Sequence, residues 1–130
     1  MKSRVIIATP IIISYGLNEK EIEKVDLIAK EVNAKHKAVF DDSLNEQIGY
    51  LCGFKSFEKS KEGSVKSSDG KCLIFSGILQ KNVSAILKGI KAEQLDIPLK
   101  AMVTTANQSW KLFDLIEELK KEHEFMTNRK

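Results

Sequence analysis

The sequence predicts an α/β domain in which a four-stranded, mainly parallel sheet carries helices on both faces. Two observations favour this fold class. Short segments rich in Ile, Val and Phe alternate strictly with stretches whose apolar residues recur every three or four positions, a pattern typical of βαβ units. The strand segments are apolar on both faces and need cover on both, which four amphipathic helices can supply. With 130 residues, of which 42% are hydrophobic and 30% charged, we expect a single domain over residues 1–130.

The chain begins with a predicted strand and helix. The Ile-rich segment Val5–Tyr15 is typical of a strand, in which Pro10 indicates a bulge, a break or an edge position. Asn18 and Glu21 have the spacing of a capping box and predict that a helix begins at Asn18. The apolar residues of this helix repeat at helical period and are Ile22, Val25, Ile28, Ala29 and Val32.

A second strand and a short helix follow. The segment His36–Phe40 predicts the strand, and Ser43 with Glu46 repeats the capping-box spacing before the helix. Residues 55–70 are polar, contain five serines and two glycines, and have no apolar period. We expect them to form a mobile loop. The alternative is that the four lysines of this segment dock an acidic partner.

The remaining elements repeat the same alternation. The sequence predicts a strand over Cys72–Ser76, a helix that ends near Asp96, a strand over Leu99–Thr104 and a long helix from about Ser109. The apolar stripes of the two helices are Val83, Ile86, Leu87 and Ile90, and Leu112, Leu115, Ile116, Leu119, His123 and Met126. We expect His123 to be a buried or half-buried structural residue.

The two halves of the chain follow one plan. Residues 5–54 and 71–127 each contain strand, helix, strand and helix, and similar residues recur 61 to 64 positions apart. We therefore predict two βαβα half-repeats. With right-handed crossovers, the simplest assembly has strand order 2-1-3-4. All four strands would then end at one border of the sheet, where ligands usually bind.

The residues predicted to meet at that border form the candidate ligand site. They are Ser14, Tyr15, Asp41, Asp42, Ser76, Thr104, Thr105, Asn107, Ser109 and Trp110. The 104–110 segment carries hydroxyl and amide groups just before a helix N-terminus, whose N–H groups and dipole suit an anion. The alternative is that Asn107 or Ser109 caps that helix while Trp110 packs in its first turn.

No metal, cofactor or catalytic residue is predicted. Asp41 and Asp42 could hold Mg²⁺, but helix capping competes and no third carboxylate is expected nearby. The glycine patterns GxGxxG and GxxxxGK[ST] do not occur in the sequence, so a dinucleotide or P-loop cofactor is not expected. Neither His36 nor His123 has a Ser or Cys partner at a suggestive spacing.

Composition restricts the classes of partner and the cellular location that we expect for the protein. The net charge of +3 arises from 19 Lys and two Arg against 18 acidic residues, and nucleic-acid surfaces rely more on Arg. We therefore expect no nucleic-acid partner. The longest apolar run is far shorter than the ~20 residues that span a bilayer, so we expect no membrane association and a cytoplasmic location. Cys52 and Cys72 are expected to be buried free thiols, with a redox or nucleophilic cysteine as the alternative.

Three segments in the second half resemble a known family. The segments are Pro98–Ala101 (PLKA), Asn107–Trp110 (NQSW) and Glu122–Met126 (EHEFM). They are similar to the PLKA-like, NxxW and EHEYM-like segments of a bacterial domain-of-unknown-function family, and the resemblance covers residues 72–126. Phe125 stands where that family is expected to have Tyr. The resemblance implies a bacterial cytoplasmic protein and draws attention to these segments without assigning them a task.

Taken together, these patterns favour a non-catalytic binding or regulatory module. The sheet border or the long last helix would engage a protein partner or an identical copy. The alternative is a small-molecule or phosphate-binding protein, or a weak enzyme, that uses the Thr104–Ser109 turn. A phosphoryl-carrier domain is disfavoured because carriers of that kind use a Cys after the first strand, where this chain has Ser14-Tyr15-Gly16.

Overall fold

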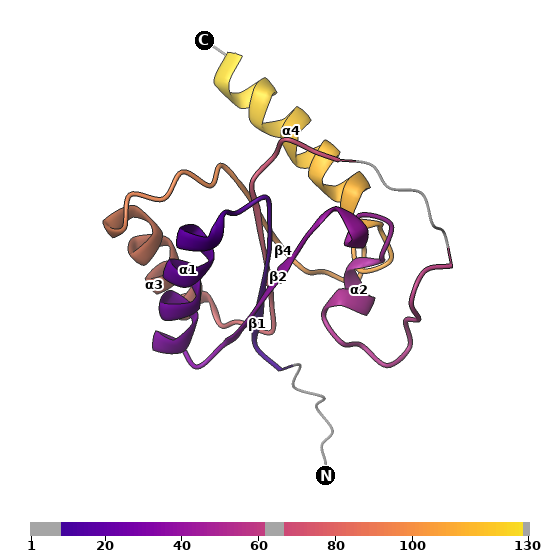
Figure 1. Cartoon of the computed structure of the whole chain (residues 1–130), viewed down its shortest axis with the longest axis horizontal. Helices are drawn as coiled ribbons and strands as arrows, with labels where there is room; N and C mark the ends of the chain where they lie inside the picture. The colour runs from indigo at the N-terminus through magenta and orange to yellow at the C-terminus, as the bar shows by residue number, and fades with distance from the viewer. Residues whose placement is uncertain (1–8, 62–66, 129–130) are drawn as a thin grey trace.

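The computed structural model describes residues 9–61 and 67–128 and has an α/β fold with one four-stranded sheet (Figure 1). The strands are β1 (Ile11–Tyr15), β2 (Lys35–Val39), β3 (Cys72–Ser76) and β4 (Leu99–Met102). They lie in the predicted order β2-β1-β3-β4. Residues 5–8 of the first predicted strand lie outside the described residues. Pro10 immediately precedes β1, and its carbonyl accepts a hydrogen bond from Lys35 N–H at 2.9 Å.

The sheet is mixed, which corrects the expectation of a mainly parallel sheet. β1 and β2 are parallel, β3 and β4 are parallel, but the central strands β1 and β3 are antiparallel, with Ile13 opposite Ile74. The connection from β2 to β3 explains the direction, because it returns to the border that it left. It runs through the single-turn helix α2 (Ile48–Leu51) to Cys52, whose thiol contacts Ser76 at the far end of β3, and then comes back to the first border, where β3 begins at Cys72.

One face of the sheet is covered by α1 (Glu19–Glu31) and α3 (Gln80–Ala92), as Figure 1 shows. The predicted capping box begins α1: Glu21 N–H donates to Asn18 Oδ1 at 2.9 Å, and Asn18 N–H donates to Glu21 Oε1 at 2.8 Å. The core of this layer includes Ile12, Leu73, Phe75, Val25, Ile28, Val83, Ile86 and Ile90. Leu87 does not join the buried stripe and is 40% exposed, because it lies one helical step from Ile86.

The opposite face is covered by α2 and by α4 (Leu112–Asn128), with the 52–61 segment beside them (Figure 1). Two reciprocal hydrogen bonds tie the starts of these helices together. Ile48 N–H donates to the Trp110 carbonyl and Leu112 N–H donates to the Glu46 carbonyl, both at 2.9 Å. The last helix therefore begins at Leu112 and not near Ser109. The side chain of Met126, which the sequence placed on its stripe, lies outside the described side chains.

Glu46 does not form the predicted capping box with Ser43. Ser43 lies in the short 3₁₀ helix Asp41–Ser43, and Glu46 is 4% exposed. The carboxylate of Glu46 instead accepts from Ser60 N–H at 2.7 Å and from Lys59 Nζ at 3.1 Å. It thereby anchors one end of the segment predicted to be a mobile loop; residues 62–66 of that segment lie outside the described residues.

The central strands are buried on both faces, as their apolar composition predicted. Every residue of β1 and β3 is buried, and each fully buried Ile or Leu there contributes about 1.5–3 kcal/mol. The edge strand β2 alternates instead, with Lys35 and Lys37 exposed. Among the described residues, no helix has the length and apolar character needed to cross a membrane.

Candidate functional site

The antiparallel central pair divides the predicted ligand site between two borders of the sheet. β1 and β2 end at the border where β3 and β4 begin. Tyr15, Asp41 and Asp42 therefore lie at one border, and Ser76 and the 104–110 segment belong to the other. The expectation that four strand ends share a single border is wrong, because it assumed that β1 and β3 run in the same direction.

The first border brings together three of the predicted residues. The Tyr15 hydroxyl donates to the Asp41 carboxylate and accepts from Ser68 N–H at 3.1 Å. Burial, and then this hydrogen bond to Asp41, raise the pKa of Tyr15. These residues, with Asp42 and Phe40, line a cavity of about 540 Å³. Among the described residues, no group of three or more His, Cys, Asp and Glu side chains is placed to hold a metal ion.

At the second border the Asn107 side chain closes its own turn. Its Oδ1 accepts from Thr104 N–H at 2.9 Å, its N–H donates to Thr104 Oγ1 at 3.1 Å, and its Nδ2 donates to the Met102 carbonyl at 3.0 Å. Asn107 therefore caps the Thr104–Asn107 turn and not α4. Thr105 and Ser109 are exposed, and Trp110 is 39% exposed, so Trp110 does not pack fully in a first helical turn.

The N–H groups at the start of α4 are occupied by the protein itself. Leu112 N–H donates to the Glu46 carbonyl at 2.9 Å, and Phe113 N–H donates to the Leu44 carbonyl at 3.0 Å. An anion beside this helix would therefore have to be held by side chains. Ser76 is 4% exposed and its hydroxyl contacts the Cys52 thiol, which removes it from any exposed site at this border.

A groove that the sequence did not predict lies at the first border, beside the second half of α4. It consists of two adjoining hollows of about 330 and 200 Å³ that share Pro98, Leu99 and His123. Three chain segments line it: residues 69–71, residues 96–100 and residues 119–124. Two of the segments that carry the family resemblance, PLKA and EHEFM, therefore lie on opposite sides of one groove.

Comparison with known proteins points to the same half of the chain. The family model described as Domain of unknown function (DUF3783) matches residues 71–126. No curated protein and no solved structure matches the chain. The DUF3783 match spans β3, α3, β4 and most of α4. It contains every groove residue except Asp69 and Gly70.

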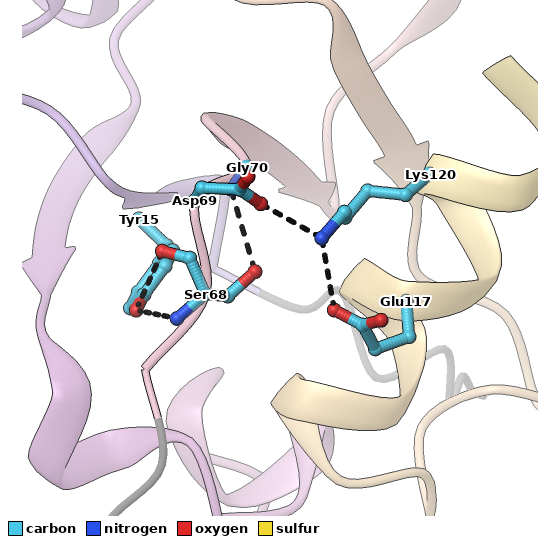
Figure 2. A network of polar contacts seen from close by, with 6 residues as sticks. All are labelled: Tyr15, Ser68, Asp69, Gly70, Glu117 and Lys120. Atoms are coloured by element: carbon cyan, nitrogen blue, oxygen red, sulfur yellow. Dashed lines mark hydrogen bonds and ion pairs between the residues drawn. The ribbon is translucent and has the colours of Figure 1, made fainter. Parts of the chain in front are cut away.

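A polar network connects the groove to the Tyr15 cavity, and Figure 2 shows its members. Lys120 Nζ lies 2.7 Å from Asp69 Oδ1 and 3.3 Å from Glu117 Oε2. Lys120 keeps the pKa of the Asp69 carboxyl below its usual value, while Asp69 and then Glu117 raise the pKa of Lys120. The neighbouring residue Ser68 donates its backbone N–H to the Tyr15 hydroxyl. Residues 68 and 69 therefore lie between the groove and the Tyr15 cavity.

His123 faces solvent, which corrects the expectation of a buried structural histidine. It is exposed, as are Glu122 and Glu124 on either side of it, because the last turns of α4 extend past the border of the sheet (Figure 1). His123 does lie in α4 at the helical spacing that placed it on the apolar stripe. The sheet, however, ends before this stripe ends. His123 instead lines both hollows of the groove.

A Ser–His–Asp arrangement occurs inside the domain, although spacing in the sequence suggested none. His36 Nδ1 lies 2.5 Å from Asp26 Oδ1, and His36 Nε2 lies 2.7 Å from Ser14 Oγ. The carboxylate can only accept, so Nδ1 carries the proton. Ser14 is 1% exposed and the His36 side chain 2% exposed. A substrate cannot reach this hydroxyl, and the arrangement instead ties α1 to β1 and β2.

The two thiols have the character of core residues. Burial raises the pKa of Cys72 to about 12, and burial also raises the pKa of Cys52. The nucleophilic form of a cysteine is the thiolate, which these pKa shifts disfavour. Both cysteines are free, as the sequence led us to expect.

Proposed function

We propose that the domain is a non-catalytic binding module whose groove, formed by residues 69–71, 96–100 and 119–124, holds a segment of a protein partner. The observation that carries the proposal is the placement of the groove. Residues 119–124 of its lining belong to α4, whose last turns project beyond the sheet border (Figure 1). Both hollows are open to the surface, so a polypeptide can contact them without entering an enclosed cavity.

The chemistry of the groove favours a polypeptide. Pro98 and Leu119 supply apolar surface. Charged side chains of both signs surround them, including Asp96, Lys100 and Glu122. An apolar centre with a polar rim is typical of protein interfaces, whereas small-molecule sites are mostly apolar and enclosed. The burial of Ser14 and the raised pKa values of both thiols support a module without a nucleophile of its own.

The proposed half-repeat would explain why the groove lies in the second half of the chain. In our proposal α2 and α4 are equivalent helices, and the reciprocal hydrogen bonds at their first residues support this equivalence. The two helices differ in length, with four residues in α2 and 17 in α4. A single-turn helix cannot project past the sheet, so the first half has no counterpart of the groove-forming turns.

We further propose that the module works in the bacterial cytoplasm. The two free cysteines support this location, because thiols stay reduced there. The resemblance of residues 72–126 to a bacterial family supports the bacterial origin.

Site-specific photocrosslinking in cells tests the proposed function. A photoreactive phenylalanine analogue replaces Glu122 in the groove or, as a control, Lys88 on the exposed side of α3. We expect a discrete crosslinked protein from position 122 and not from position 88, to be identified by mass spectrometry and then purified. A product of twice the mass of the chain would identify the partner as a second copy.

The purified partner then permits a quantitative test. The paired charge reversal Glu122→Lys and Glu124→Lys should weaken binding at least tenfold, because both carboxylates lie on the groove rim. Lys88→Glu, on the other helical layer, should leave the Kd unchanged. Equal crosslinking from both positions, or a Kd that the paired reversal does not alter, would contradict the proposal.

A further inference from the structure

A second hollow lies at the opposite end of α4 from the groove and has a different chemistry. Its volume is about 420 Å³, and every residue that lines it is polar. Lys59 and Lys61 come from the segment after α2, and Lys111 precedes α4. The other lining residues are Asn45, Gln47, Glu58, Ser60 and Ser109. This lysine-lined hollow belongs neither to the groove nor to the Tyr15 cavity.

Hydrogen bonds to the backbone hold both walls of the lysine-lined hollow in place. Gln47 and Lys111 form an isolated antiparallel bridge, and Gln47 Nε2 donates to the Ser109 carbonyl at 2.9 Å. On the other wall, the buried Glu46 carboxylate holds Ser60 N–H at 2.7 Å. These contacts hold the segment that contains Lys59 and Lys61 near the start of α4.

The charge of the hollow is positive. Three ammonium groups face one carboxylate in the lining, that of Glu58, and the Glu46 carboxylate behind the wall balances Lys59. The hydrogen bond to Glu46 raises the pKa of Lys59, which keeps this lysine protonated. The positive end of the α4 dipole lies beside Lys111 and adds to the same field.

We propose that the lysine-lined hollow binds a phosphorylated small molecule. Lysine ammonium groups are flexible point charges that suit the tetrahedral oxygens of phosphate, and the hydroxyl and amide groups of Ser109 and Asn45 add neutral polar partners. The all-polar lining offers no surface for an apolar ligand. Because Leu112 and Phe113 use their N–H groups internally, the lysine side chains bind the phosphate and the helix contributes only its field.

The test uses sodium tripolyphosphate as the probe and isothermal titration calorimetry on the full chain. The paired variant Lys61→Gln and Lys111→Gln should weaken binding at least tenfold. The matched pair Lys88→Gln and Lys91→Gln removes the same charge from the exposed face of α3 and should change the Kd less than twofold. Circular dichroism melts verify that both variants fold.

Two results would overturn the proposal. The first is the absence of binding heat at millimolar tripolyphosphate, or an equal loss in both paired variants, which would indicate general attraction to a basic protein. The second comes from a single-stranded oligonucleotide titrated in parallel. If the oligonucleotide binds more tightly than tripolyphosphate and depends equally on Lys88 and Lys91, the lysines form a diffuse polyanion surface and not a phosphate site.

Discussion

At the scale of single residues, Tyr15 shows how a buried polar group stabilises one border of the sheet. Its hydroxyl joins Asp41 to the Ser68 backbone. Tyr15→Phe should lower the free energy of unfolding by about 1–2 kcal/mol, since a hydrogen bond to a charged group is lost. Urea denaturation at pH 7 measures the change. A variant as stable as the parent would show that the two contacts contribute nothing to stability.

The raised pKa of Tyr15 also predicts a pH dependence. The unfolded chain releases the tyrosine proton near pH 10, whereas the folded chain keeps it to higher pH. The stabilisation is therefore complete below pH 10 and decreases as the pH rises above that value. Because other groups titrate in the same range, the quantity to follow is the difference between parent and Tyr15→Phe. This difference should shrink as the pH rises above 10, and a constant difference would contradict the assignment.

The two cysteines should differ in reactivity in the folded protein. Cys72 is 0% exposed and has a pKa of about 12, whereas Cys52 is only partly buried. At pH 8 a thiol reagent such as 5,5′-dithiobis(2-nitrobenzoate) should label Cys52 slowly and leave Cys72 unlabelled over the same period. Both should react at once in guanidinium chloride. Rapid labelling of Cys72 without denaturant would show that β3 opens readily.

Some residue partnerships could not be foreseen from the sequence because they depend on strand register. Ser14 and His36 are 22 positions apart, and they meet only because β1 and β2 are parallel with Ile12 beside His36. The Asn18 capping box, in contrast, was predictable, because both of its partners lie within one helical turn. Spacing in the sequence therefore predicts contacts within one helix or strand. It does not predict contacts that form only when two strands pair.

At the scale of elements, the four strands and the long helices followed from periodicity, and the strand order followed from the simplest assembly of two right-handed units. The direction of β3 did not follow from either. A right-handed βαβ unit is satisfied within each half whichever way the halves are joined. The direction depends on how the connection between β2 and β3 folds, and residues 55–70 of this connection are polar and have no apolar period to indicate it. The groove was missed because it lies where β3 and β4 begin, whereas ligands were expected where the strands end.

Two glycines with the same backbone conformation provide a matched test of that packing. Gly16 and Gly53 have φ values of +85° and +86°, so alanine at either position costs about 1 kcal/mol in backbone strain. A Cβ on Gly16 would also lie 2.7 Å from the Gly70 carbonyl oxygen, whereas a Cβ on Gly53 meets nothing within 4 Å. Gly16→Ala should therefore destabilise the domain by roughly 1–3 kcal/mol more than Gly53→Ala. Equal losses in urea denaturation would show that β1 and the segment before β3 are not in close contact.

At the scale of the whole molecule, the central strands β1 and β3 pair symmetrically about their middle residues. Ile13 and Ile74 are the middle residues of β1 and β3 and lie opposite each other. The reciprocal bonds between Ile48 and Trp110 and between Leu112 and Glu46 repeat this symmetry on the helical layer. In the proposed half-repeat each half would offer the other the same kind of surface, which is the geometry of an isologous dimer.

This symmetry predicts the behaviour of the second half alone. A fragment of residues 67–130 contains β3, α3, β4 and α4, but it lacks the strand that pairs with β3. An unpaired apolar strand edge tends to pair with another strand. Two fragments should therefore pair through β3, with Ile74 opposite Ile74, and form one four-stranded sheet between them. Light scattering coupled to size exclusion should give twice the fragment mass, and circular dichroism should show helix.

Two substitutions separate this specific pairing from general association. Ile74 is 1% exposed and Leu79 is 64% exposed. Ile74→Lys should abolish both the dimer and the helical signal, because it places a charge at the centre of the shared sheet. Leu79→Lys should preserve both and so acts as the matched control. A fragment that folds as a monomer would show that β3 does not need a partner strand. The pairing of the two halves would then contribute nothing to the folding of each half.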